Sequence, residues 1–183
     1  MEKTISFKSI IYKKETETKR IKLWLDELPN LKNVSSNTFS ERIDLNSGQQ
    51  KDFKKLCIEL SFLRHASNYA LLGFEYIPHN GSYLEVDILF SDKNTEKYLS
   101  NHLFGSETKY CGLAKEYVAA IFDEIRTFSK NSCMASGKII FKVAANCEIG
   151  SSELIFRKAT QMLLKIFINN ITDENEIKEM FNI

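Results

Sequence analysis

The chain has few of the residues and motifs that mark specialised proteins. Its 183 residues include two prolines, seven glycines, one tryptophan and three histidines. The glycines form neither G-x-G-x-x-G nor G-x-x-x-x-G-K-[ST], so the loops that commonly bind phosphate groups are absent. No run approaches the roughly 18 apolar residues of a membrane span, and the N-terminus lacks the apolar core of a signal peptide. We therefore expect a soluble, cytoplasmic protein with no membrane partner.

The cysteines are few and widely spaced. None belongs to a C-x-x-C pair, and none has a histidine at the spacing of a metal site. We expect four free, reduced thiols that behave as small core residues, and we expect no metal and no cofactor. They are Cys57, Cys111, Cys133 and Cys147.

The charges nearly cancel. There are 25 basic and 24 acidic side chains, which leaves a net charge of +1. A dedicated nucleic-acid binder usually has a clear basic excess, so we expect no DNA partner, although a local patch for structured RNA stays open. Apolar residues make up 43% of the chain. A chain of this length is expected to form a single domain, 1–183, that buries roughly 70% of its unfolded surface.

Three segments of the first 47 residues have the composition or the alternation that predicts strands. The strands are expected at residues 4–12, 21–26 and 38–45. The mixed charges of residues 13–20 indicate a solvated hairpin turn between the first two. Trp24 falls on the opposite face from Ile21 and Leu23, where we expect another element to cover it.

Residues 48–64 are predicted to form a helix. Ser47 and Gln50 have the spacing of a capping box, in which two side chains satisfy the free amides of a helix start. Apolar residues then follow at helical spacing, and lysines occupy the other side. The apolar residues are Phe53, Leu56, Cys57, Leu60 and Leu63.

Residues 65–169 are predicted to form a β-β-α-β-α unit. Strands are expected at 69–77 and 83–90, joined as an antiparallel hairpin by the Asn80–Gly81 turn. Helical spacing follows over 113–130, and an apolar run at 139–144 indicates another strand. A helix starts at Ser151–Ser152, with Leu154 and Ile155 among its apolar positions. We also expect a short helix at 95–104 and a C-terminal helix within 172–183. The fold class is therefore α+β, a mainly antiparallel sheet with amphipathic helices packed on one face.

Three segments of this unit are similar to a known family. They are residues 64–78 (RHASNYALLGFEYIP), 112–120 (GLAKEYVAA) and 150–159 (GSSELIFRKA). Together they resemble domain IV of translation elongation factor G, across roughly residues 64–169. The resemblance implies a ribosomal protein S5 domain 2-like fold for the second half. A shared fold does not by itself carry that factor's action over to this chain.

The candidate site lies in two loops, 64–68 and 146–152, which we expect at the same end of the sheet. The candidate binding residues are Arg64, His65, Asn68, Glu148, Ser151 and Ser152. Free amides at the start of a helix can bind a phosphate or a carboxylate, and Arg64 would join them there. Ordinary capping by the two serines is the alternative interpretation.

No catalytic residue is predicted. The three histidines, His65, His79 and His102, have no partner in the sequence that suggests a triad or a metal site. Glu85 and Asp87 lie two residues apart on one strand, which fits either paired carboxylates in a cleft or a solvated strand face.

We therefore expect a non-catalytic binding module that recognises a protein or a structured RNA. Two alternatives stay open: an enzyme whose active-site residues are dispersed in the sequence, and an inhibitor or immunity-type protein. The sequence does not indicate the partner or the oligomeric state.

Overall fold

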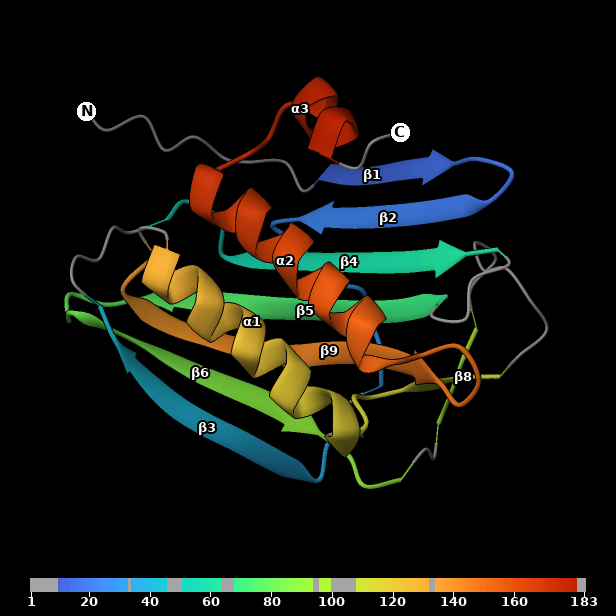
Figure 1. The fold of residues 1–183 in the computed structure, drawn as a ribbon, viewed down its shortest axis with the longest axis horizontal. Helices are drawn as coiled ribbons and strands as arrows, with labels where there is room; N and C mark the ends of the chain where they lie inside the picture. The colour runs from blue at the N-terminus through green and yellow to red at the C-terminus, as the bar shows by residue number, and fades with distance from the viewer. Residues whose placement is uncertain are drawn as a thin grey trace.

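The computed structural model describes residues 10–32, 34–45, 51–63, 68–93, 96–99, 108–131 and 134–180. Within these ranges the chain forms a nine-stranded sheet and three α-helices (Figure 1). The strands are β1 Ile10–Glu15, β2 Lys19–Leu25, β3 Asn37–Asp44, β4 Lys55–Phe62, β5 Tyr69–Pro78, β6 Tyr83–Phe90, β7 Lys97–Tyr98, β8 Lys109–Cys111 and β9 Gly137–Cys147. The helices are η1 Lys115–Tyr117 (a 3₁₀ turn), α1 Val118–Asn131, α2 Glu153–Asn169 and α3 Glu174–Met180.

The sheet runs in the order β1-β2-β4-β5-β9-β6-β3, and β8 pairs with both β9 and the short β7. Every named strand pair is antiparallel except β6–β9, which is parallel. Helices α1 and α2 lie side by side across the same face of the sheet (Figure 1). The structure is therefore the expected α+β fold with helices on one face. None of the helices in the described ranges is long and apolar enough to cross a membrane.

The helix predicted at 48–64 is wrong, because residues 55–62 form strand β4. β4 lies between β2 and β5, and both of its faces are covered. Leu56, Ile58 and Leu60 face the helices, while Cys57 and Glu59 face the other way and are buried too. A strand buried on both faces loses its alternation, so its apolar residues can match helical spacing by chance. Residues 46–50, which include the predicted cap, lie outside the described ranges.

The predicted β5–β6 hairpin is also wrong. The chain does reverse between these strands, but β9 lies between them and pairs with both. A local turn signal determines where the chain reverses, whereas the choice of neighbour depends on long-range pairing. In the region predicted as a helix at 95–104, the structure has the short strand β7, and residues 100–107 lie outside the described ranges.

The remaining elements agree with the sequence prediction to within a few residues. These are strands β2, β3, β5, β6 and β9 and helices α1, α2 and α3. The expected strand at 4–12 appears as β1, which starts at Ile10, and residues 1–9 lie outside the described ranges. The predicted turn after it lies at residues 16–18, where the Thr16 hydroxyl accepts a hydrogen bond from the Lys19 amide at 2.9 Å.

The main core lies between the sheet and helices α1 and α2. Phe74 of β5 makes edge-to-face contacts with Phe141 of β9 and Phe167 of α2, each with 5.3 Å between ring centroids. Tyr76 contacts the same Phe167 ring at 4.9 Å. These aromatic rings join the two central strands to α2, since each pair adds a geometric preference to its buried area.

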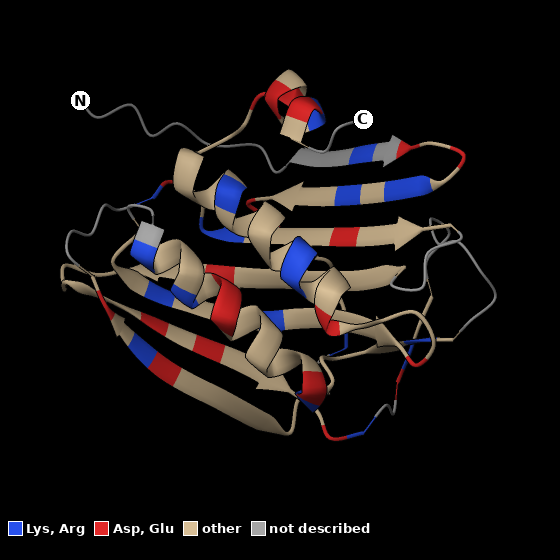
Figure 2. Ribbon diagram, viewed as in Figure 1, with Lys and Arg blue, Asp and Glu red and all other residues tan. Residues whose placement is uncertain are grey.

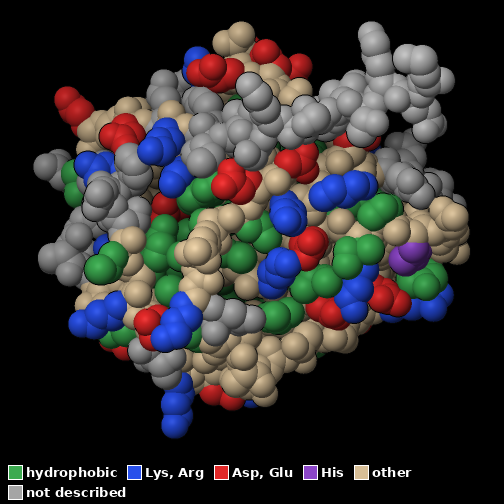
Figure 3. All heavy atoms as spheres, turned by 180° about the vertical axis from the view of Figure 1, so that it is seen from behind, with side chains coloured by type: hydrophobic (Ala, Val, Ile, Leu, Met, Phe, Trp, Pro, Cys, Tyr) green, Lys and Arg blue, Asp and Glu red, His purple; other side chains and the backbone are tan. Residues whose placement is uncertain are grey.

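A second, smaller core lies on the opposite face, which we call the back face. It consists of Trp24, Cys57, Tyr69, Leu71, Ala145 and Cys147. Leu28 and Leu31 of the segment after β2 pack against it, so Trp24 is covered as expected. Outside this core, Figure 3 shows basic, acidic and hydrophobic side chains intermixed on the back face. The three cysteines in the described ranges, Cys57, Cys111 and Cys147, are buried free thiols.

We expect Phe167→Ala to lower the free energy of unfolding by about 3–5 kcal/mol, since it removes a fully buried ring and leaves a cavity. Urea unfolding followed by circular dichroism measures the change. The control is Leu154→Ala on the same helix, whose side chain is 69% exposed and whose replacement is expected to cost at most about 0.5 kcal/mol. An equal decrease in the free energy of unfolding in the two variants would contradict the orientation of α2, which buries Phe167 and exposes Leu154.

Candidate functional site

Asn68, the one described residue of the first predicted loop, meets the second predicted loop where β5 begins and β9 ends. The carbonyl of Gly150 accepts hydrogen bonds from the amides of Asn68 (2.7 Å) and Tyr69 (3.2 Å). The Ser151 hydroxyl accepts a bond from the Cys147 amide (2.8 Å) and donates one to the Tyr69 carbonyl (2.7 Å). These bonds hold the two segments together. We call Asn68 with residues 148–154 the tip.

Gly150 is required at the centre of the tip. Its φ of +117° is a conformation that side chains with a Cβ rarely adopt. A Cβ at this position would lie 2.0 Å from Oδ1 of Asn68. The glycine therefore allows the close approach of the two segments.

The predicted site residues differ in whether the structure describes them and in how exposed they are. Arg64 and His65 lie outside the described ranges. Asn68 is half-buried beside Gly150, and Glu148 is exposed on the other side of the turn. The Ser151 hydroxyl donates its proton to the Tyr69 carbonyl and accepts a bond from the Cys147 amide, so it has no proton left to donate to a ligand. Ser152 occupies the N-cap position of α2, but its side chain makes no capping hydrogen bond, so the expected capping by a hydroxyl is not found there.

The tip exposes apolar side chains that sequence reasoning did not select. Ile149 is 75% exposed and Leu154 is 69% exposed. Glu148 and Glu153 are exposed next to them in the sequence. Leu154 was expected on the buried face of its helix, but it lies in the first turn of α2 and points to solvent. The tip thus presents apolar and acidic groups on a segment braced by hydrogen bonds.

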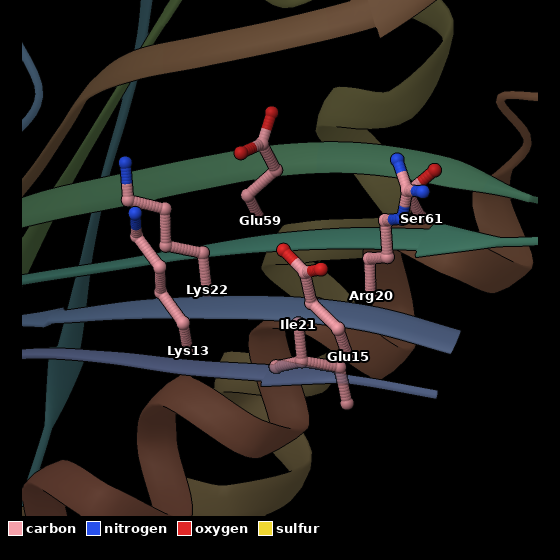
Figure 4. Close-up of a pocket in the computed structure, with 7 residues that line it drawn as sticks. All are labelled: Lys13, Glu15, Arg20, Ile21, Lys22, Glu59 and Ser61. Carbon is pink, nitrogen blue, oxygen red and sulfur yellow. The ribbon is translucent and has the colours of Figure 1, made fainter. Parts of the chain in front are cut away.

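A second group of polar residues lies on the back face, on strands β1, β2 and β4 (Figure 4). Lys13, Lys22 and Glu59 are direct neighbours across the three strands, as are Glu15, Arg20 and Ser61. Glu59 is only 2% exposed, and the Tyr69 hydroxyl donates a hydrogen bond to it at 3.2 Å. The hollow among these residues has a volume of about 10 Å³. That is room for about one water molecule and not for a substrate.

Two groups near Glu59, the Tyr69 hydroxyl and the Cys57 thiol, have raised pKa values. Burial raises the pKa of the Tyr69 hydroxyl well above its ordinary value, and the Glu59 carboxylate raises it further. Burial also raises the pKa of the Cys57 thiol, an effect that Glu59 strengthens and Lys22 opposes. A catalytic thiol needs the opposite shift, because the thiolate is the nucleophile. These groups therefore fit a structural role.

Tyr69 gives a test that depends on pH. Its pKa is higher in the folded than in the unfolded chain, so its contribution to stability is complete below the unfolded value of about 10 and is lost as the pH rises above it. We expect the free energy of unfolding to fall above about pH 10, and Tyr69→Phe to flatten this decline. At pH 7 the same variant is expected to cost about 1–3 kcal/mol, because the hydrogen bond from the Tyr69 hydroxyl to Glu59 is lost. Urea unfolding at several pH values measures the free energy of unfolding. If this free energy falls as steeply with pH in Tyr69→Phe as in the wild type, the prediction is wrong.

The other sequence candidates have structural explanations. Glu85 and Asp87 both lie near Lys138, at 3.8 Å and 2.6 Å, so they belong to an ion-paired strand face and do not form a pair of carboxylates in a cleft. His79 lies in the turn before β6, where its Nδ1 accepts a hydrogen bond from the Gly81 amide at 2.9 Å. Across the described ranges, no three histidine, cysteine or acidic residues are grouped so that they could hold a metal ion.

No family model, curated protein or solved structure matches this chain. The order of elements between 65 and 169 is β5, β6, the short β7 and β8, α1, β9 and α2, which contains the predicted β-β-α-β-α sequence. The likeness to domain IV of elongation factor G stays a prediction.

Proposed function

We propose that this protein is a non-catalytic binding module that recognises another protein through its tip. The observation that supports this most is the exposure of Ile149 and Leu154 on either side of a turn held by the Gly150 and Ser151 hydrogen bonds. Apolar side chains gain free energy when a partner covers them, and a rigid turn loses little conformational entropy on binding.

The charges favour a protein over RNA. Glu148 and Glu153 flank the apolar residues of the tip, and carboxylates repel phosphate groups. On the back face, Lys138 forms an ion pair with Asp87, and Lys142 forms one with Glu75. Figure 2 shows basic and acidic residues interspersed along the strands and helices, not gathered by sign. The described surface therefore offers no basic track for a nucleic-acid backbone.

The two alternatives differ in how well the structure supports them. The buried polar group around Glu59 has room for about one water, and burial raises the pKa of the Tyr69 hydroxyl and of the Cys57 thiol there, which is unfavourable for an enzyme at this position. An inhibitor or immunity-type role is a special case of the proposal, in which the recognised protein is an enzyme or a toxin. The acidic and apolar character of the tip fits that case as well.

A capture experiment tests the proposal. The wild-type chain and the variant Ile149→Asp/Leu154→Asp are immobilised and exposed to the native lysate, and the affinity for each captured protein is then measured. We expect the variant to lose at least about tenfold in affinity, since covering one Ile or Leu side chain is worth about 1.5–3 kcal/mol. The matched control is Leu99→Asp, because Leu99 is 89% exposed but lies outside the tip.

Two outcomes contradict this proposal. One is capture that the double variant leaves unchanged. The other is capture that nuclease abolishes and that weakens steeply with salt, which would indicate RNA.

A further inference from the structure

A cleft of about 350 Å³ lies between α1 and the sheet edge formed by β3. It is lined by Phe39, Phe90, Val118, Ala119 and Phe122, with Glu41, Lys115, Asp123 and Arg126 at its rim. The Phe39 and Phe122 rings meet edge to face, with 5.3 Å between their centroids. The volume falls within the range of about 300–1,000 Å³ that is typical of binding pockets, and the floor is apolar. The cleft lies on β3 and α1, whereas the tip lies on β5, β9 and the start of α2.

β3 is an edge strand, and the backbone groups on its outer side pair with no other strand that the structure describes. Among the described residues it pairs with β6 and with no other strand. The Leu45 amide donates to the Ser82 carbonyl at 2.9 Å, in register with the β3–β6 ladder. Because hydrogen-bonded positions alternate in an antiparallel pair, Phe39, Glu41 and Ile43 bond toward β6. The amides and carbonyls of Thr38, Ser40 and Arg42 therefore point outward.

This edge lacks two of the features that usually protect edge strands, proline and a β-bulge. β3 contains no proline, and its register with β6 has no bulge. Its charges are balanced locally, since Glu41 pairs with Arg126 of α1 and Arg42 pairs with Asp44 at 3.2 Å. Phe39 remains 36% exposed at the mouth of the cleft. Open backbone groups beside an apolar cleft are the features that strand addition uses.

We propose that β3 pairs antiparallel with β3 of a second copy of this chain, about a two-fold axis at Ser40. In an antiparallel pair, side chains that lie directly opposite each other are on the same face of the sheet. An axis between two residues would place side chains from opposite faces across from each other. The axis must therefore pass through a residue. The two longest registers centre on Ser40 (residues 37–43 of each copy) and on Glu41 (residues 38–44 of each copy). The Glu41 register places two glutamates directly opposite each other, which is unfavourable.

The Ser40 register avoids this repulsion. It places Phe39 opposite Glu41 of the second copy and Thr38 opposite Arg42 of the second copy. Ser40 of each copy then exchanges hydrogen bonds with the other, as its outward-pointing backbone groups allow. The axis runs perpendicular to the sheet, so both α1 helices lie on the same side and the two clefts open onto each other. Water is excluded from both aromatic floors, and both tips stay accessible.

The oligomeric state in solution tests the proposal. Sedimentation equilibrium over a wide concentration range is expected to give a species of twice the 21.1 kDa chain mass. Ser40→Pro removes the outward amide without removing a hydrogen bond to β6, so the fold is expected to persist while dimerisation weakens at least about tenfold. The matched control is Ser40→Ala, which keeps the amide and is expected to dimerise as the wild type does.

A second variant covers the case in which Ser40→Pro does not fold, as judged by circular dichroism. Ala119 is exposed and lines the cleft from α1, so Ala119→Arg places a long charged side chain in the space that the dimer closes. It is expected to be folded and monomeric. A monomeric wild type overturns the proposal, even if another protein or a peptide occupies the edge. A dimer that persists in folded Ser40→Pro and Ala119→Arg also overturns it. Neither result affects the proposed role of the tip, which the Ile149 and Leu154 variant tests separately.

Discussion

The pairing of β9 with both β5 and β6 is the constraint on which the rest of the structure depends. β9 runs antiparallel to β5 and parallel to β6, so it joins β1, β2, β4 and β5 on one side to β6 and β3 on the other. A parallel neighbour cannot be reached by a tight turn, and the chain therefore crosses over through α1 between β6 and β9. Helix α2, which follows β9, returns across the same face beside α1 (Figure 1). One strand insertion thus accounts for the position of both helices.

Packing around β9 is close on both faces. On the helix side, Phe141 of β9 and Phe74 of β5 share one aromatic cluster with Phe167 of α2. On the back face, a Cβ at Gly73 would lie 2.7 Å from Cβ of Cys57, so the small core under Trp24 has no room for a larger residue there. The register of β5 and β9 shifts between Gly73 and Phe74. The extra residue, Lys142, lies on β9, so Phe141 before it belongs to the main core whereas Ala145 after it belongs to the back-face core.

The tip follows from the same pairing. Because β5 begins where β9 ends, Asn68 and Gly150 meet, and the Ser151 hydroxyl bonds to both segments. The sequence did indicate that Asn68 and residues 146–152 share one end of the sheet. It also selected the serines as ligand contacts, whereas the structure uses the Ser151 hydroxyl internally. The exposed apolar residues Ile149 and Leu154 carry the proposed recognition instead.

Local patterns in the sequence predicted those elements that have one face against the core and one face toward solvent. β6 is an example, since Leu84, Val86 and Ile88 face the core while Glu85 and Asp87 face solvent. β4 could not be recognised this way, because both of its faces are buried and its alternation is hidden. The insertion of β9 was missed because the Asn80–Gly81 signal is local, whereas pairing joins residues far apart in the chain. The contact of Glu59 with Tyr69 was missed for the same reason, since it requires β4 to be a strand.

Strand adjacency tests the central constraint most directly, and it is measured by nuclear Overhauser effects between backbone protons of the uniformly labelled chain. The account predicts contacts between β9 and β6 in parallel register, such as Lys138 with Glu85 and Ile140 with Asp87. It also predicts antiparallel contacts between β9 and β5, such as Ile139 with Tyr76. Direct backbone contacts between β5 and β6, without β9 between them, would contradict it.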